Sequence, residues 1–267
     1  MQNSVPAQRP IKRNVSFVSM KRVLLLCLIS MAGFTAFSQT KPAKSEAAAP
    51  KAPATPVAAP AKPVRAAKYE VLYGSKPLSK ADQKELNVFV ASCDASFGSR
   101  AEAVTFFAER AWEYVASAHL DTATYRFNLI SALDPNSVDA FWGLGVISFQ
   151  RGDNDLAIRL LNKGLELDST QSMMRVDYAI VKLSCYEKGQ DCGSLDEVES
   201  ELKHALAQDP KNANAWMKRC QVAYYKENYE LAWTYFHEAR MADILQLDLN
   251  FGSLLAAKMP DPKGIFK

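Results

Sequence analysis

The sequence predicts an all-α protein in which helical hairpins stack one after another into a solenoid. Apolar residues recur at helical spacing through most of residues 69–267, and no stretch alternates between apolar and polar residues over a useful length, so we expect no strand. Corners that begin with aspartate recur at Asp134, Asp168 and Asp209. The second interval exceeds the first by a short insertion, which indicates one repeated unit with a seven-residue excess in its third copy.

Residues 20–38 resemble a secretory signal peptide. Lys21 and Arg22 supply the positive charge, an apolar run extends to Phe34, and small residues precede a cleavage point before Gln39. The apolar run is shorter than the roughly 20 residues that a membrane-spanning helix needs. We therefore expect the segment to be cleaved, which leaves no integral membrane span, and the protein to be exported to a bacterial periplasm or to the medium.

The remaining N-terminal residues carry no fold signal. Residues 1–19 are an upstream extension, and either Met1 or Met20 starts the protein. Residues 39–68 are a run of Ala, Pro and Lys without aromatic residues, which cannot bury enough apolar surface to offset the entropy of ordering. We expect a disordered linker that acts as a spacer, the interpretation we favour, or as a basic arm that touches anionic cell-wall or membrane material.

The charge distribution argues against nucleic-acid binding. The whole chain has a formal net charge of +3, but residues 1–68 hold 11 of the basic residues and one acidic residue. Residues 69–267 therefore hold 21 basic and 28 acidic residues. The folded part is mildly acidic and has no basic stripe, so it lacks the electrostatic footprint of a nucleic-acid-binding domain.

The first predicted helices begin at serine caps. Ser79 starts a helix that runs to about Ala95, and Ser99 with Glu102 forms a capping box for the next one. In residues 138–171, small residues lie where two helices must cross closely, at Gly145, Ala157 and Gly164. Large apolar residues fill the crossing; they are Phe141, Leu144, Leu161, Leu165 and Leu167.

This pattern resembles the tetratricopeptide repeat, a helix–turn–helix unit of about 34 residues. The resemblance covers about residues 104–244 and implies a right-handed solenoid of about four repeats, which often holds other proteins. The repeats are residues 104–137, 138–171, 172–212 and 213–244. In the second repeat Ser148, Gly164 and Ser169 depart from the usual large aromatic residue, alanine and proline. The match is strongest in the second and fourth repeats.

The third repeat and the two ends are irregular. The seven-residue excess lies near Lys188 to Ser194 and is a tolerated surface insertion, the interpretation we favour, or a loop that contacts a partner. A solenoid needs an atypical end to cover its last apolar face. We expect residues 248–258 to form that capping helix, and Phe266 to fold back as an apolar plug.

Four cysteines follow the signal-like segment. Cys185 and Cys192 flank the inserted loop, and in an oxidising compartment we expect them to form a disulfide. Cys93 and Cys220 are expected to be small buried helix residues.

No arrangement of residues predicts an enzyme, a metal site or a cofactor. The three histidines have no partner at metal-ligand spacing, and the chain has no nucleophile or phosphate-binding motif. A zinc site from Cys185, Cys192 and His204 lacks a fourth ligand. The acidic cluster at Asp196, Glu197, Glu199 and Glu201 is expected to be a solvated helix face.

The resemblance also implies where a partner would bind. In tetratricopeptide proteins the first helix of each repeat lines the concave face. The family's ligand-facing positions correspond here to Trp112, Trp142, Val146, Phe149, Met173, Val176, Ile180, Met217, Gln221 and Tyr224. These residues are unusually apolar for a face in solvent. Either they form a groove for a partner peptide or helix, or they pack against one another.

The sequence thus predicts a non-enzymatic protein-interaction module, an adaptor or assembly factor for other proteins of the cell envelope. The alternative is a structural subunit of a larger envelope complex, with the Ala/Pro/Lys segment as a spacer. The sequence does not name the protein partner.

Overall fold

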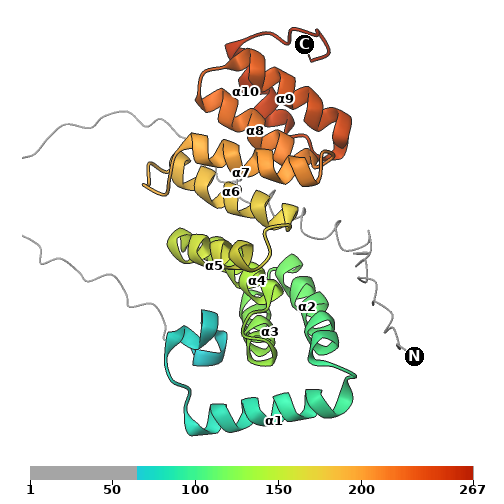
Figure 1. The fold of residues 1–267 in the computed structure, drawn as a ribbon. Coiled ribbons are helices and arrows are strands. Elements are labelled where there is room, and N and C mark those ends of the chain that lie inside the picture. Colours follow the sequence, from blue (N-terminus) through green and yellow to red (C-terminus); the bar gives the residue numbers. More distant parts are fainter. Residues whose placement is uncertain (1–64, 267) are drawn as a thin grey trace, which may run out of the picture. The chain divides into compact units, whose positions relative to one another are not determined.

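A computed structural model describes residues 65–266, which form ten α-helices with short connections and no strand (Figure 1). The upstream extension, the signal-like segment and the linker up to residue 64 lie outside the described residues. The folded unit begins at Ala66, shortly before the predicted start at residue 69.

Eight of the helices form four consecutive hairpins. Within each pair the helices pack closely, and each second helix packs against the first helix of the next pair (Figure 1). The hairpins are α2 (Arg100–Ala116) with α3 (Leu120–Leu133), α4 (Val138–Gln150) with α5 (Asn154–Leu167), α6 (Ser172–Glu187) with α7 (Leu195–Gln208), and α8 (Ala213–Tyr225) with α9 (Tyr229–Ala242).

Side-chain caps and tight turns explain where these helices begin. Ser99, Ser137, Ser194 and Asn212 each accept a hydrogen bond from a backbone N–H in the first turn of the following helix. Inside the second hairpin the turn residue Gly152 has φ of +83°, a conformation in which glycine has no steric penalty.

Two glycines let α4 approach its neighbours. A methyl group on Gly145 would lie 2.8 Å from Cγ of Leu161, which confirms the predicted close crossing of α4 and α5. Gly143, which the sequence analysis did not single out, is more confined. A methyl group there would lie 2.1 Å from the ring of Phe127, a fully buried residue of α3. Gly145 therefore allows the close packing of α4 and α5 within the second hairpin, and Gly143 allows the close packing of α4 against α3 of the first hairpin.

The N-terminal end is held by a clasp, which we define as residues 66–75 bound to Asn128 of α3. The clasp consists of η2 (Ala67–Tyr69) and η3 (Val71–Ser75). The buried amide of Asn128 donates to the carbonyls of Lys68 (3.1 Å) and Glu70 (2.8 Å), and it accepts from the N–H of Leu72 (2.9 Å). Helix α1 (Lys80–Ser96) follows and contacts α2 and α3. Its serine cap, Ser79, is the predicted one.

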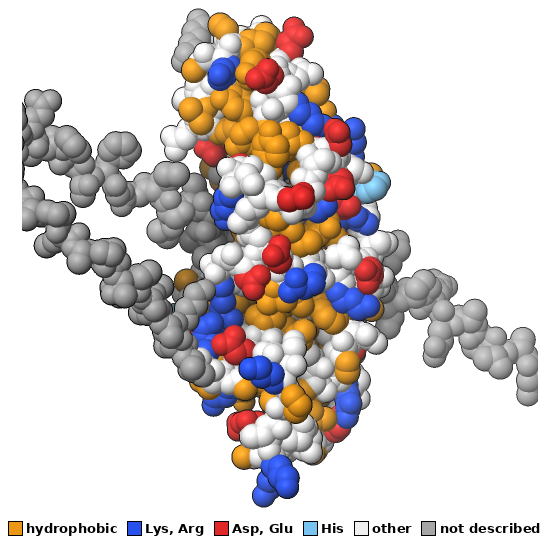
Figure 2. All heavy atoms as spheres, turned by 90° about the vertical axis from the view of Figure 1, so that its left-hand side faces the viewer, with side chains coloured by type: hydrophobic (Ala, Val, Ile, Leu, Met, Phe, Trp, Pro, Cys, Tyr) orange, Lys and Arg blue, Asp and Glu red, His pale blue; other side chains and the backbone are white. Residues whose placement is uncertain are grey.

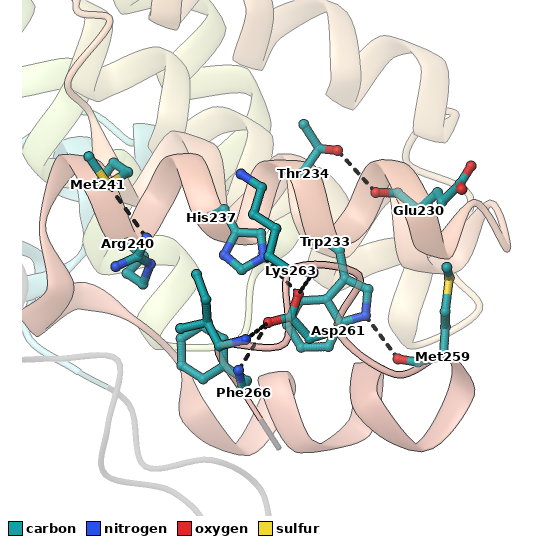
Figure 3. A network of polar contacts seen from close by, with 11 residues as sticks. Glu230, Trp233, Thr234, His237, Arg240, Met241, Met259, Asp261, Lys263 and Phe266 are labelled. Carbon is teal, nitrogen blue, oxygen red and sulfur yellow. Dashed lines mark hydrogen bonds and ion pairs between the residues drawn. The ribbon is translucent and has the colours of Figure 1, made fainter.

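The C-terminal end is closed by η4 (Ile244–Gln246), α10 (Leu249–Lys258) and a tail that folds back onto α9 (Figure 3). Trp233 donates from Nε1 to the carbonyl of Met259 at 2.9 Å. The ring of Phe266 lies 6.1 Å from that of Trp233 and 5.1 Å from that of Phe236, which confirms the predicted plug. Asp261 ties the tail down by accepting from the backbone N–H groups of Lys263, Ile265 and Phe266.

Candidate functional site

The first helices of the hairpins lie next to one another along one side of the stack. Helix α2 contacts α4, α4 contacts α6, and α6 contacts α8, whereas the second helices pack against the first helix of their own hairpin and against the first helix of the next. The first helices therefore line the inner side, as the resemblance implies. Figure 2 shows the side of the molecule at the left of Figure 1, where patches of hydrophobic side chains alternate with charged side chains.

Most of the residues assigned to the inner face keep part of their surface exposed. They are Trp112, Trp142, Val146, Phe149, Met173, Ile180, Gln221 and Tyr224. Val176 and Met217 are exceptions, with exposed fractions of 0% and 3%. Both pack into the core, Val176 beside Leu202 and Met217 beside Phe236. The assignment of these two residues to an open face was wrong.

Val176 and Met217 were assigned wrongly because the sequence does not fix how α6 and α8 are rotated about their own axes. Successive residues of a helix point about 100° apart. An error of one residue in a register taken from the helix corners therefore moves the predicted exposed position to a neighbouring residue. In α6 the half-buried residue after Val176 is Asp177, and in α8 the one after Met217 is Lys218. The inner face therefore carries two charged residues where apolar ones were predicted.

Three residues of the inner face join three successive hairpins. The ring centroids of Trp112 on α2 and Trp142 on α4 lie 5.2 Å apart, in an edge-to-face arrangement of 68°. Trp142 donates from Nε1 to Oδ2 of Asp177 on α6 at 2.6 Å. We call Trp112, Trp142 and Asp177 the tryptophan–aspartate cluster. Asp177 was not predicted from the sequence, although an acid next to apolar residues in the middle of a first helix was a visible signal.

The surroundings of Asp177 disfavour its charge. Burial raises the pKa of its carboxyl group to about 6, and the hydrogen bond from Trp142 only partly opposes this shift. The basic residues of the same helix are engaged elsewhere, because Arg175 binds Glu201 and Lys182 binds Glu197, both on α7. Among the described residues no cation was found to lower the pKa of Asp177.

The far end of the inner face packs against itself. The ring of Tyr224 lies 5.7 Å from that of Tyr225, 5.6 Å from that of Tyr229 and 5.2 Å from that of Phe251 on α10. Tyr224 is thus surrounded by rings of its own chain, while the tryptophan–aspartate cluster has no such cover from α10. The inner face thus packs against its own chain at Tyr224, whereas the tryptophan–aspartate cluster is the part that a partner could contact.

The inserted loop of the third hairpin is closed covalently. Cys185 and Cys192 form a disulfide, the pair that the sequence favoured, with their Cα atoms 5.8 Å apart. Gln190 within the loop accepts from Nδ2 of Asn154 at 2.9 Å, which ties the loop to the second hairpin. Cys93 and Cys220 are buried free thiols, as predicted, and burial raises the pKa of each.

The acidic cluster of α7 is only in part the predicted solvated face, because Asp196 and Glu197 are exposed whereas Glu199 and Glu201 are partly buried. Asp196 binds Lys226 at 2.6 Å, and Glu199 binds Arg219 at 2.6 Å. Glu197 and Glu201 bind the basic residues of α6. The four carboxylates therefore link α7 to its neighbours, and Glu199 is largely buried. The correction follows from the neighbouring helices, which present their basic residues toward α7.

A histidine and an aspartate, His237 and Asp261, form a buried pair that holds the C-terminal tail against α9. His237 and Asp261 lie 2.9 Å apart, and both are buried (Figure 3). Burial would raise the pKa of Asp261, but hydrogen bonds from Phe266, Lys263, His237 and Ile265 outweigh it and lower the pKa to about 2. The described residues contain no group of His, Cys, Asp or Glu arranged to hold a metal ion. Nor do they contain a helix that is long and apolar enough to cross a membrane.

Comparisons with known proteins find similarity at the level of structure only. No family model and no curated protein matches the sequence. PilF of Pseudomonas aeruginosa is 19% identical, with 60% of this chain and 72% of that chain covered and a TM-score of 0.49. MamA is 15% identical over 64% and 98%, with a TM-score of 0.45. YrrB, described as a TPR protein with an unusual peptide-binding site, is 21% identical over 65% and 86%, with a TM-score of 0.45.

The chain's own helices establish its fold. Paired helices of similar length recur four times, with small residues at the close crossings and first helices along the inner side. The chain is an array of four tetratricopeptide-type helical hairpins that ends in α1 and the clasp on one side and in α10 and the tail on the other.

Proposed function

We propose that this chain is a non-enzymatic protein-interaction module that binds a partner peptide or helix along its inner face. The observation that carries the proposal is the tryptophan–aspartate cluster. Tryptophan side chains that keep exposed surface on adjoining elements are typical of residues that dominate binding energy. Their position on first helices matches the ligand-facing positions that the resemblance implies.

We further propose that the partner belongs to the bacterial cell envelope and that the chain acts there as an adaptor or assembly factor. The support for export is the signal-like sequence of residues 20–38 together with the cysteine pair, which suits an oxidising compartment. A structural subunit of a larger complex remains the alternative. Affinity capture of the full chain from the native envelope separates the two. Retention of a partner at fixed stoichiometry through purification would support the structural role, and transient capture would support the adaptor.

The inner face is tested with the captured partner and the variant Trp142→Ala. Truncation of a central aromatic residue typically weakens binding by at least about tenfold, and we expect this loss in calorimetric titration. The matched control is Met241→Ala, which removes an exposed apolar side chain from a second helix. Full partner affinity in a folded Trp142→Ala protein would reject the inner face as the binding site. Tyr224→Ala is a weaker test, because the Tyr224 ring also packs against α10.

A further inference from the structure

The tryptophan–aspartate cluster combines a carboxylate with aromatic rings. The indole ring of Trp142 lies beside the carboxylate, and the indole ring of Trp112 lies beside that of Trp142. The carboxylate is half-buried and has no cation from the described chain. Other carboxylates nearby differ in this respect. Those of α7 each bind a lysine or arginine of a neighbouring helix.

The single hydrogen bond to Asp177 leaves its acceptor capacity unfilled. Trp142 occupies Oδ2, whereas a carboxylate offers two oxygens and about four lone-pair sites. Lys218, the charged residue of α8 on this face, hydrogen-bonds Gln221 at 3.0 Å. The basic residues of α6 bind α7, as described above. Asp177 therefore keeps acceptor capacity for a donor from outside the chain.

An alkylammonium or guanidinium group meets these requirements best. Such a cation is attracted to the face of an indole ring within about 6 Å, and its charge-assisted hydrogen bond to a carboxylate is about twice as strong as a neutral one. The aliphatic stem of lysine or arginine can lie along apolar surface while the charged end reaches the acid. Trp112 and Trp142 offer that surface, and Asp177 offers the acid.

We propose that Trp112, Trp142 and Asp177 form a receptor for one lysine or arginine side chain of the partner peptide. The proposal rests on the proposed function and deepens it, because it names the chemistry that the partner presents. A neutral apolar peptide would fill the same face without using Asp177. That alternative is an outcome of the test.

The test uses the full chain and four synthetic peptide pools at physiological ionic strength. All peptides share one length and carry uncharged random positions on both sides of a central lysine, arginine, glutamine or norleucine. We expect the lysine and arginine pools to bind at least about tenfold more tightly than the other two, measured by microscale thermophoresis. Equal binding of all four pools would overturn the receptor while leaving the proposed function intact.

Variants assign the preference to the cluster. Asp177→Asn keeps an acceptor for Trp142 but removes the charge, so it should abolish the preference for basic residues, measured as the affinity of the lysine and arginine pools relative to the norleucine pool. Asp155→Asn is the matched control, because it removes one negative charge from the exposed face of α5. A basic preference that survives in Asp177→Asn, or that is lost in Asp155→Asn, would contradict the proposal.

One further outcome bears on both proposals. If no pool binds and the envelope capture also yields no partner, both the receptor and the interaction function are rejected. If the capture succeeds and the captured partner loses no affinity on Asp177→Asn, only the receptor is rejected.

Discussion

Asp177 shows how a residue suited to binding can be unsuited to stability. An ionised carboxylate in partly desolvated surroundings without a cation disfavours the folded state, because the same group is fully hydrated when the chain unfolds. The free protein therefore bears a penalty at neutral pH, and a bound cation would relieve it. This penalty can be measured without a ligand.

The variant Asp177→Asn should be more stable than the wild type at high pH. The pKa of Asp177 is about 6 in the folded chain, against about 3.9 for an unfolded one. The folded state thus holds the proton more tightly, so the wild type loses stability as the pH rises from about 4 through 6. We expect the variant to gain about 1–2 kcal/mol at pH 8 and nothing at pH 4, measured by urea unfolding.

Asp155→Asn serves again as the control, since its exposed carboxylate should make no such difference. An Asp177→Asn protein that is equally stable to the wild type at both pH values would show that the carboxylate is not penalised.

Residue identity alone could not have placed the cluster. Trp112 and Trp142 were assigned to the inner face because the repeat positions are known, and both keep exposed surface there. Asp177 was missed because its neighbour Val176 occupies the family position, and only the rotation of α6 about its own axis distinguishes the two. That rotation depends on packing against α5 and α7, which a single-sequence pattern does not encode.

At the level of the helices, α4 packs closely against its neighbours because it has glycine at two contact positions. Gly143 and Gly145 lie on faces that meet α3 and α5, and the rings and branched side chains opposite fill the space that a methyl group would need. Gly145 was predicted from the repeat pattern. Gly143 was not, because its partner Phe127 belongs to the preceding hairpin and contacts between hairpins leave a weaker sequence signal.

Replacing Gly143 with alanine should destabilise the protein despite alanine's higher helix propensity. Overpacking of a tight core typically costs about 1–3 kcal/mol, and propensity returns less than about 1 kcal/mol. We expect a lower midpoint in thermal unfolding followed by circular dichroism.

The double variant Gly143→Ala with Phe127→Leu provides the control, because the smaller side chain opens space for the methyl group. The loss in the double variant should be smaller than the sum of the two single losses. Strict additivity would mean that Phe127 is not the obstacle.

At the level of the whole molecule, the segments at both ends of the helix stack cover its terminal helices. Asp261 gathers four hydrogen-bond donors around one buried carboxylate and thereby holds the tail over Trp233. Its pKa is lowered to about 2. The stability that it contributes is fully present above its unfolded pKa of about 3.9 and is lost as the pH falls toward 2.

The variant Asp261→Ala should therefore be less stable than the wild type at pH 7, by about 2 kcal/mol. The difference should shrink between pH 4 and pH 2. Tryptophan fluorescence during urea unfolding measures it, since Trp233 lies under the tail. A difference that persists unchanged at pH 2 would show that the charge of Asp261 is not what holds the tail.

Much of the architecture was predictable because repetition gives the same signal several times. The corners at Asp134, Asp168 and Asp209 set the register, Ser79 started α1, and Phe266 returned to the core as expected. The clasp at Asn128 was not predictable. It depends on a polar side chain in α3 that meets the backbone of a segment far earlier in the chain, and no periodicity reports such a contact.

The clasp also determines how the array would carry a mechanical load. Tension applied to the N-terminal side of the clasp would load the three hydrogen bonds of Asn128 and the hydrogen bond from Arg151 to the carbonyl of Tyr69 before it reached α1. Leu72, Tyr73 and Gly74 have φ between +48° and +71°, a tight left-handed turn that extension would have to unwind. Asn128 and Arg151 therefore act as the points at which force on the N-terminal side enters the first two hairpins.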